Sequence, residues 1–253
     1  MLTVFSPGSR LREISALWRR QLILWIALYF CLLFPSSAAG QTAADVARNV
    51  LPSVVLLSTA DRNGQPLSIG SGFFVRKNQI ITNLHVVAAA QRATAKLKGT
   101  DREFAVDGSV ATDDAHDLAV IQVTGIEGPS LLISSDSNIQ IGDQIYVAGN
   151  PEGLEGTFSQ GIISAIRELP AGRILQITAP ISPGSSGGPV LNQQGQVIGV
   201  AFATLRDGQN LNFALPSSHV RDLMQKAQDV RPLAALGSAS NAQGIFWNAL
   251  RER

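Results

Sequence analysis

Cysteine is almost absent from this sequence of 253 residues. The only cysteine, Cys31, lies in an apolar run near the N-terminus. A protein without further cysteine forms no internal disulfide, so its hydrophobic core alone must hold it together. The sequence also lacks histidine and cysteine clusters at zinc-ligand spacing, a phosphate-binding loop and a dinucleotide-binding glycine motif. We therefore expect no metal and no cofactor.

An excess of charge of either sign is also missing. The chain has 20 Lys and Arg residues against 19 Asp and Glu residues, which gives a formal net charge of +1. Because nucleic-acid binding usually requires a strong basic field, we expect no nucleic-acid partner. The composition, with 45% hydrophobic and 15% charged residues, is that of a folded protein rather than a disordered one.

No apolar run is long enough to span a bilayer. The N-terminal run Leu22–Phe34 falls short of the roughly 20 residues that a spanning helix needs. Four arginines precede this run and the small residues of PSSAAG follow it. This pattern is typical of a secretory signal peptide over residues 1–40, and it predicts export to the periplasm or out of the cell. An uncleaved membrane anchor over the same residues is the alternative.

Beyond residue 40 the sequence consists mostly of short stretches rich in Val and Ile. Turn pairs such as Asn63-Gly64 and Asp207-Gly208 separate these stretches, and the spacing predicts an all-β barrel or sandwich. About six of the strands precede a linker at about 124–141, and about six follow it. The candidate strands are 54–59, 69–75, 79–82, 93–97, 104–111, 118–123, 144–149, 157–166, 174–178, 189–191, 197–203 and 211–214. Two helices are expected, at 43–49 and 220–229, with Ser217 and Ser218 available to cap the second.

Residues 182–191 read SPGSSGGPVL and place two serines among three glycines. A surface turn is one interpretation, since Gly, Pro and Ser are common turn residues. The other is that one serine is a nucleophile, because glycine leaves room for a substrate carbonyl beside bare backbone N–H groups. A serine nucleophile needs a base, usually histidine, and a group that orients the imidazole.

The search for a base is short, because the chain has only three histidines: His85, His116 and His219. His85 follows an apolar strand in IITNLHVV, and side chains at a strand end can face a cleft. Asp117 stands directly before the apolar strand LAVIQV, where its carboxylate can be dehydrated and held against an imidazole. His116 is expected to be a solvated neighbour of Asp117, because successive side chains in a strand point to opposite faces.

The order His85, Asp117, Ser186 is that of the chymotrypsin type. The stretches TNLHVV, DLAVIQV and PGSSGGPVL resemble the three catalytic stretches of trypsin-like serine proteases of the HtrA/Deg branch, and the likeness covers roughly residues 44–225. The resemblance implies an all-β fold of two six-stranded antiparallel barrels with a C-terminal helix and an active site between the barrels. It places the protease domain at 41–229 and a tail at 230–253.

Applied to single residues, the resemblance makes Ser186 the nucleophile, His85 the general base and Asp117 the group that orients it. The backbone N–H groups of Gly184 and Ser186 would form the oxyanion hole. The specificity pocket implied by the fold is lined by Ala179, Pro180, Val200, Ala201, Phe202 and Ala203. These residues carry no carboxylate, so we expect cleavage after small or medium apolar residues such as Val, Ala or Leu.

The resemblance implies a serine endopeptidase that hydrolyses unfolded or misfolded polypeptides. Members of this branch commonly carry one or two PDZ domains after the protease domain, and only 28 residues follow Gln225 here. We therefore expect a protease without a PDZ domain. A homo-oligomer, a trimer by family analogy, is a further implication.

Two alternatives stay open. The first is a protease fold without turnover that serves as a binding or chaperone module. The second is an α/β-hydrolase esterase, because GSSGG also matches G-x-S-x-G and is followed by Asp207 and His219 in the required order. An elbow serine must follow a strand and open a helix, whereas the residues after Ser186 continue as strands. The protease interpretation is therefore favoured.

Overall fold

The computed structural model describes residues 18, 21, 25, 41–169, 172–204 and 211–236, without the side chains of residues 203 and 204. The chain divides into two compact units, 1–40 and 41–253. The predicted signal peptide lies outside the described residues, apart from the three positions in the first unit. None of the helices in the described part of the chain is long and apolar enough to cross a membrane.

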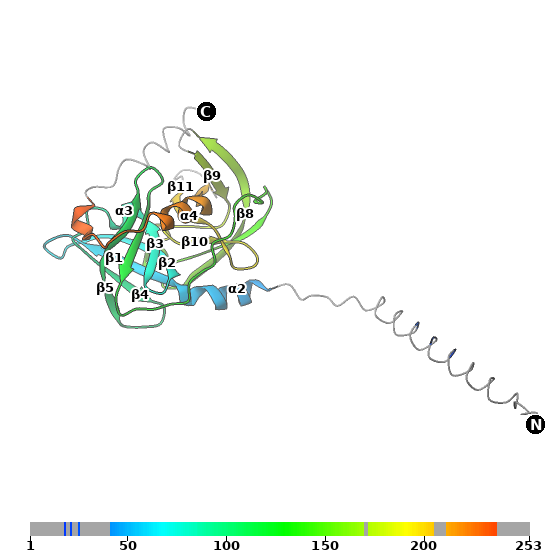
Figure 1. Ribbon diagram of the computed structural model, residues 1–253, viewed down its shortest axis with the longest axis horizontal. Coiled ribbons are helices and arrows are strands. Elements are labelled where there is room, and N and C mark those ends of the chain that lie inside the picture. Colours follow the sequence, from blue (N-terminus) through cyan, green and yellow to red (C-terminus); the bar gives the residue numbers. More distant parts are fainter. Residues whose placement is uncertain are drawn as a thin grey trace, which may run out of the picture. The chain divides into compact units, whose positions relative to one another are not determined.

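The second unit contains twelve strands in two closed antiparallel barrels, which confirms the predicted fold (Figure 1). The first barrel has the strand order β1-β2-β3-β6-β5-β4, and the second has the order β10-β11-β12-β9-β8-β7. The first barrel consists of β1 (Val54–Ala60), β2 (Pro66–Arg76), β3 (Gln79–Asn83), β4 (Arg92–Leu97), β5 (Glu103–Asp113) and β6 (Leu118–Val123). The second consists of β7 (Gln144–Gly149), β8 (Thr157–Leu169), β9 (Gly172–Ile177), β10 (Pro189–Leu191), β11 (Val197–Thr204) and β12 (Asn212–Pro216).

Short helices lie at the connections. The α-helices are α2 (Ala43–Val50), α3 (Leu84–Val87) and α4 (Ser217–Gln225), and the 3-10 helices are η1 (Leu51–Ser53), η2 (Pro151–Gly153) and η3 (Leu233–Ala235). Helix α2 begins in a capping box, in which Thr42 and Asp45 bond to each other's backbone N–H groups. Helix α4 packs against strands of both barrels, namely β5, β6, β11 and β12.

Buried side chains fill each barrel and also the space between the two barrels. Successive side chains of a strand point to opposite faces, so Phe74 lies in the core of the first barrel and Phe73 lies in the cluster shared by both. Both phenylalanines are fully buried. The same shared cluster holds Leu118 of β6 and Val200 of β11. This packing on both faces explains why the strand sequences read as continuous apolar runs rather than as alternating ones.

The start of α4 corrects one prediction. Its N-cap residue is Pro216, and no side chain caps the helix. Ser217 and Ser218 lie inside the helix. Their hydroxyls donate to Ser134 and Asp136 in the segment 124–143 between β6 and β7, the inter-barrel connection, instead of to the helix backbone. The prediction that these serines cap the helix is therefore wrong.

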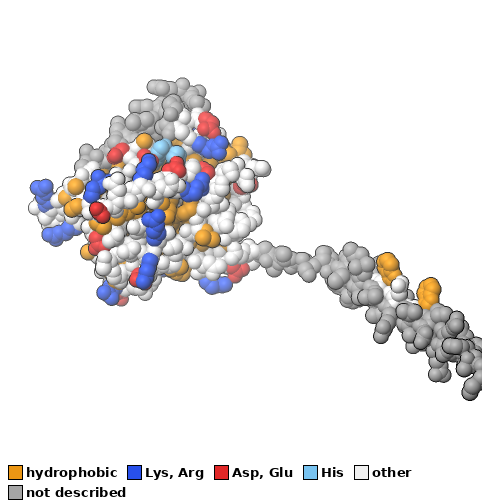
Figure 2. Space-filling model, in the orientation of Figure 1, with side chains coloured by type: hydrophobic (Ala, Val, Ile, Leu, Met, Phe, Trp, Pro, Cys, Tyr) orange, Lys and Arg blue, Asp and Glu red, His pale blue; other side chains and the backbone are white. Residues whose placement is uncertain are grey.

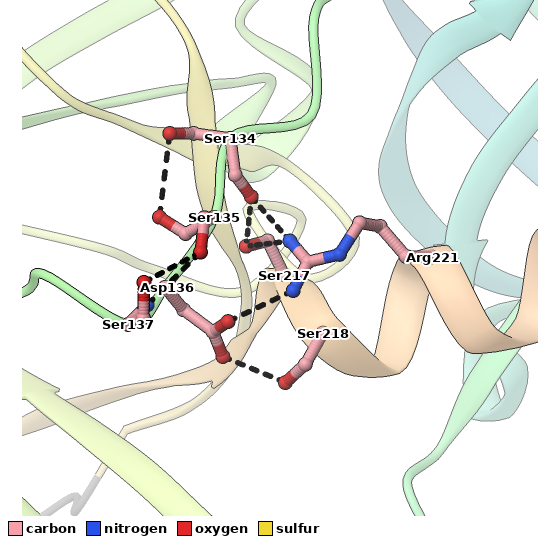
Figure 3. A network of polar contacts seen from close by, with 7 residues as sticks. All are labelled: Ser134, Ser135, Asp136, Ser137, Ser217, Ser218 and Arg221. Atoms are coloured by element: carbon pink, nitrogen blue, oxygen red, sulfur yellow. Dashed lines mark hydrogen bonds and ion pairs between the residues drawn. The ribbon is translucent and has the colours of Figure 1, made fainter.

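A polar network joins the inter-barrel connection to α4 (Figure 3). The carbonyl of Ser134 accepts from the Ser217 hydroxyl at 2.8 Å and from the Arg221 guanidinium. The carboxylate of Asp136 accepts from the Ser218 hydroxyl at 2.6 Å and from Arg221 at 3.0 Å. Burial by itself would raise the pKa of Asp136, but the hydrogen bonds from Ser218 and Arg221 outweigh burial and lower it.

The segment after α4 returns to the first barrel. Arg231 and Ser109 exchange two backbone hydrogen bonds of 2.8 Å, and Leu233 is buried against the barrel core. A side chain at Gly108 would place its Cβ 2.2 Å from the carbonyl oxygen of Arg231. Residues up to 236, which the sequence interpretation placed partly in a tail, are therefore attached to the first barrel.

The surface of the described unit carries mixed charge. On the face seen in Figure 2, Lys and Arg side chains are scattered, and Asp and Glu side chains lie among them. Several ion pairs of this kind are exposed, such as the one between Arg173 and Glu168, whose side chains are 43% and 67% accessible. Exposed pairs contribute little to stability, so the packed clusters and the partly buried Asp136 network matter more.

We expect Asp136→Asn to lower the free energy of unfolding at pH 7 by about 1–3 kcal/mol, because charge-assisted hydrogen bonds are lost. The pKa of Asp136 is lower in the folded state than in the unfolded state. The stabilisation from its carboxylate is therefore complete above the unfolded pKa of about 3.9 and is lost as the pH falls from there through the lower folded-state pKa. Urea unfolding of both proteins from pH 7 to pH 3 measures this. Glu168→Gln, the control, should change the free energy by less than about 0.5 kcal/mol. A difference between Asp136→Asn and wild type that is the same at pH 3 and pH 7 would contradict the assignment.

Candidate active site

The loop 182–188 lies between β9 and β10, and its carbonyl groups at residues 183 to 186 all accept hydrogen bonds within the protein. The carbonyl of Pro183 accepts from the N–H of Glu152 at 2.8 Å, and that of Gly184 accepts from the hydroxyl of Ser71 at 2.7 Å. The carbonyl of Ser185 accepts from the N–H of Gly188 at 2.9 Å, and that of Ser186 accepts from the N–H of Ser71 at 2.8 Å. Four successive peptide planes are thereby fixed.

The N–H groups of the same loop fall into two sets. Those of Ser185 and Gly187 donate within the protein, to the carbonyls of Ser182 and Ala201, each at 2.9 Å. Within the described part of the chain, the N–H groups of Gly184 and Ser186 have no acceptor. Because C=O and N–H point in opposite directions across a trans peptide, these two N–H groups point away from the contacts that hold their carbonyls. They are the two N–H groups that the sequence predicted for an oxyanion hole.

The loop conformation requires glycine at position 184. Gly184 has φ +93°, in the left-handed region, and a Cβ there would lie 2.7 Å from the carbonyl oxygen of Asn150 and 3.0 Å from the nitrogen of Glu152. Any side chain would therefore displace the backbone of the neighbouring loop. The glycines in SPGSSGGPVL thus serve a close backbone approach as well as a turn.

The two serines of the loop have different surroundings. Ser185 is only 4% exposed, and its hydroxyl accepts from the N–H of Ser182 at 3.2 Å. Its side chain is therefore turned into the loop. Ser186 is partly exposed. Of the two, Ser186 is the serine whose side chain is open to a ligand.

His85 and Asp117 form a close pair beside the first barrel. Asp117 lies in the turn before β6, and its Oδ2 is 2.5 Å from His85 Nδ1. Its Oδ1 accepts from the His85 backbone N–H at 2.8 Å, and its carbonyl accepts from Leu84 N at 3.0 Å and from Asn83 Nδ2 at 2.9 Å. A carboxylate can only accept, so Nδ1 carries a proton, and in a neutral imidazole Nε2 is then the nitrogen with the lone pair.

The local backbone explains why this pair forms. His85 lies in the first turn of α3, which follows directly on strand β3. Asp117 has φ +52°, an uncommon value for a residue with a side chain, and it lies directly before the buried strand β6. The side chain of Asp117 is 5% accessible, whereas that of His85 is 27% accessible. The carboxylate is therefore dehydrated, while the imidazole reaches the surface.

The structure brings the loop of Ser186 to the strand that leads into His85. A Cβ at Gly187 would lie 2.2 Å from the carbonyl oxygen of Ser71 and 2.5 Å from the Thr82 hydroxyl. The Thr82 hydroxyl in turn donates to that same carbonyl at 2.8 Å. The loop that carries Ser186 therefore lies against the end of β3, directly before the helix α3 that holds His85.

The remaining histidines lie elsewhere, and His116, which was expected to be a solvated neighbour of Asp117, is only partly exposed, with a side chain that is 24% accessible. His116 and His219 stack with ring centroids 3.7 Å apart and an interplanar angle of 22°, and His116 Nδ1 is 2.9 Å from Asp113 Oδ2. Burial, followed by the charge of His116, lowers the pKa of His219. In the described residues, no group of three His, Cys, Asp or Glu side chains is arranged to hold a metal.

The residues predicted for the specificity pocket are placed unevenly. Ala179, Val200 and Ala201 are fully buried in hydrophobic clusters, and Phe202 is 3% exposed. The side chain of Ala203 lies outside the described residues. Pro180 is exposed and borders a small pocket of about 120 Å³ together with Ile181, Ser182 and Ser185. Ala201 reaches the loop through its backbone, which pairs with Gly187 and Gly188.

The structure excludes the α/β-hydrolase alternative as a fold. The chain forms two antiparallel barrels, and the residues after Ser186 lead into strand β10 rather than into a helix. Of the proposed esterase residues, Asp207 lies outside the described residues, and His219 is stacked on His116.

Three contributors to the loop were missed in the sequence: Ser71, Asn150 and Glu152. Ser71 stands between Gly70 and Gly72 in an otherwise apolar strand, and that pattern was the available signal for it. Asn150 and Glu152 lie in a connection without any pattern of their own. Their contacts with the loop depend on how the two barrels are placed, which spacing along one sequence does not give.

Comparison with known proteins places these features in a family. The family model described as "Trypsin-like peptidase domain" matches residues 70–200. The putative serine protease HhoA of Synechocystis is 40% identical over 159 residues, which cover 58% of this chain and 40% of that protein. The mitochondrial serine protease HTRA2 of Bos taurus is 32% identical over 200 residues, covering 73% of this chain and 43% of that protein. The chain thus spans about two fifths of the length of these curated relatives.

Solved structures give the same result. The HtrA-type protease AlgW with a tripeptide is similar with a TM-score of 0.66 and 30% identity, covering 73% of this chain and 62% of that chain. The active form of the Rv3671c protease from M. tuberculosis is similar with a TM-score of 0.69 and 26% identity, covering 77% of this chain and 89% of that chain.

We expect Gly184→Ala to destabilise the protein more than Gly64→Ala does. Both glycines have positive φ, so each substitution costs about 1–2 kcal/mol of backbone strain. Only at Gly184 does a Cβ also meet neighbouring backbone, whereas none lies within 4 Å at Gly64. A total loss of about 2–5 kcal/mol is therefore expected for Gly184→Ala, measured by urea unfolding. Equal losses for the two variants would show that the loop is not packed as described.

Proposed function

Because the chain belongs to the family of trypsin-like peptidase domains, we propose that it is a serine endopeptidase. The observation that carries the proposal is the pair of N–H groups, at Gly184 and Ser186, that is left open beside a partly exposed serine. It is supported by the imidazole of His85, whose Nδ1 is held by the buried carboxylate of Asp117.

The proposed reaction is acyl transfer. The hydroxyl of Ser186 attacks a peptide carbonyl, and Nε2 of His85 takes the hydroxyl proton. The carboxylate of Asp117 stabilises the imidazolium, and the two open N–H groups donate to the oxyanion of the tetrahedral intermediate. His85 then protonates the leaving amine, so that the C–N bond breaks. In the second half, water attacks the acyl-enzyme and gives its proton to His85, and Ser186 leaves with that proton.

We propose polypeptides in unfolded or misfolded form as substrates. Relatives that match this chain are named probable periplasmic serine endoproteases, DegP-like, and AlgW is described with a tripeptide. The same names support export to the periplasm for this chain. A homo-oligomer, a trimer by family analogy, stays a prediction, as does the position of the signal peptide at residues 1–40.

We expect a fluorophosphonate to label wild-type protein and Ser185→Ala, and to leave Ser186→Ala unlabelled. The reason is that the Ser185 hydroxyl is turned into the loop, whereas Ser186 is partly exposed and carries one of the two open N–H groups. Mass spectrometry of the labelled peptide and degradation of unfolded casein provide the measurements. Label or proteolysis that survives in Ser186→Ala contradicts the assigned nucleophile. A wild-type protein that binds casein but neither takes up label nor cleaves it is a binding module.

Asp117→Asn should lower kcat by about 10⁴ with little change in KM, because an amide does not fix the required tautomer of the imidazole. Peptide hydrolysis at pH 7 measures it, and Asp114→Asn is the control at a nearby exposed carboxylate. A loss of less than tenfold in Asp117→Asn would contradict the proposed role.

For peptides that differ only in the residue before the scissile bond, we expect the highest kcat/KM with Val, Ala or Leu. The pocket residues predicted from the sequence offer no carboxylate to pair with a basic side chain. Steady-state rates on a panel of matched peptides test this preference. Faster cleavage after Lys or Arg would overturn the assignment of the pocket.

A further inference from the structure

Ser71 of β2 connects the first barrel with the loop of the proposed nucleophile. Its side chain is fully buried, and its hydroxyl donates to the carbonyl of Gly184 at 2.7 Å. The same hydroxyl accepts from the backbone N–H of Asn150 at 2.8 Å. Its backbone N–H donates to the carbonyl of Ser186 at 2.8 Å. One residue of the first barrel therefore holds two peptide groups of the loop 182–188 and a third at Asn150.

We propose that the Ser71 hydroxyl is a positioning residue for the oxyanion hole, which it orients through the carbonyl of Gly184. This inference rests on the proposed function, because it assigns a task in the same reaction. Ser71 does not touch substrate. It holds the peptide plane between Gly184 and Ser185, which lies between the two planes that carry the N–H groups of Gly184 and Ser186, and it thereby supports the orientation of both N–H groups.

The direction of the hydrogen bond is fixed by its neighbours. A hydroxyl has one proton and two lone pairs, and the N–H of Asn150 can only donate to it. The hydroxyl proton is therefore free for Gly184, whose carbonyl can only accept. This arrangement holds the plane between Gly184 and Ser185, while the N–H of Glu152 holds the preceding plane through the carbonyl of Pro183.

Glycine makes such an anchor necessary. Gly184 has no side chain and takes φ +93°, so few contacts of its own restrain rotation of the adjacent peptides. If the Gly184 carbonyl were released, the plane between Gly184 and Ser185 could turn, and the two adjoining planes, which carry the N–H groups of Gly184 and Ser186, would lose the support that keeps these groups in position. Catalysis by such donors depends on their being in place before the reaction, so a loosely held donor loses part of its effect.

Asn150 makes the anchor rigid from the other side. Its side-chain Nδ2 donates to the carbonyl of Val55 at 2.8 Å, and its Oδ1 accepts from the N–H of Gly156 at 2.9 Å. Farther along the same connection, Glu155 pairs with Lys96 of β4 at 2.7 Å. The partner that orients the Ser71 hydroxyl is thus itself fixed to the first barrel.

The chain provides a matched control for a test of Ser71. Ser109 is also a fully buried serine of the first barrel, and its hydroxyl donates to the carbonyls of Ala111 at 3.0 Å and Val120 at 3.1 Å. Its hydroxyl makes no bond to the loop of Ser186. Ser71→Ala and Ser109→Ala therefore remove comparable buried hydrogen bonds, but only Ser71→Ala releases Gly184.

The experiment measures peptide hydrolysis per active site titrated with fluorophosphonate, using the full chain. For Ser71→Ala we expect kcat per titrated site to fall about 10–100-fold, which is less than the 10²–10³ loss typical of removing an oxyanion donor outright. KM should change by less than about threefold. The inhibition constant of a peptide boronic acid, which forms a tetrahedral adduct, should rise by the same factor as kcat/KM falls.

Two further results separate positioning from structural support. Ser109→Ala should keep kcat per titrated site within about twofold, whatever it does to the melting temperature. Ser71→Thr, which keeps the hydroxyl, should recover most of the lost kcat. If Ser71→Ala does not fold, Ser71→Cys replaces it, because a thiol of similar size is a weak donor.

The outcomes are distinct. A Ser71→Ala or Ser71→Cys protein with wild-type kcat per titrated site, and a loss only in the titratable fraction, overturns the role of Ser71 and leaves the proposed function intact. A wild-type chain that is neither labelled nor active overturns the proposed function, and with it the reaction that Ser71 would serve.

Discussion

The contact between the two barrels is the constraint on which the site depends. Ser186 belongs to the second barrel, whereas His85 and Asp117 belong to the first, so neither barrel contains a complete site. A shared apolar cluster holds the barrels together, with Phe73 from one barrel and Val200 from the other. The polar contacts of Ser71 then set the position of the loop against the first barrel. Packing provides the affinity between the barrels, and these hydrogen bonds provide the alignment.

The cost of unsatisfied backbone groups explains how the loop keeps two N–H groups open. A buried donor or acceptor without a partner costs about 1–3 kcal/mol, and the four successive carbonyls at residues 183 to 186 each have a partner. Once the carbonyls of Pro183 and Ser185 are engaged on one side, the next N–H groups must face the other side. The two open N–H groups therefore follow from the hydrogen bonds that the carbonyls make. Glycine at position 184 allows this loop conformation, because a Cβ there would collide with the backbone of Asn150.

Most of the fold could be predicted, because strand patterns and the chain order of polar residues are local. Strands β6, β7 and β10 were predicted with the bounds that the structure has. The turn at Asp117 and the strand before His85 could be read in the same way. What failed depends on contacts between distant segments. Ser217 and Ser218 resembled caps, but the connection at Ser134 and Asp136 takes their hydroxyls. His116 resembled a surface residue, but His219, more than a hundred residues later, stacks on it.

The placement of α4 sets an order in which the molecule can be completed during synthesis. This helix is among the last described elements, yet it packs on β5 and β6 of the first barrel and holds the connection that leads to the second. A nascent chain that has emerged only as far as Ser186 still lacks β10, β11, β12 and α4. His85 and Asp117 are already made, but β11, which pairs with the loop through Ala201, is not. The contacts that hold the loop of Ser186 therefore become complete only when these later segments have folded.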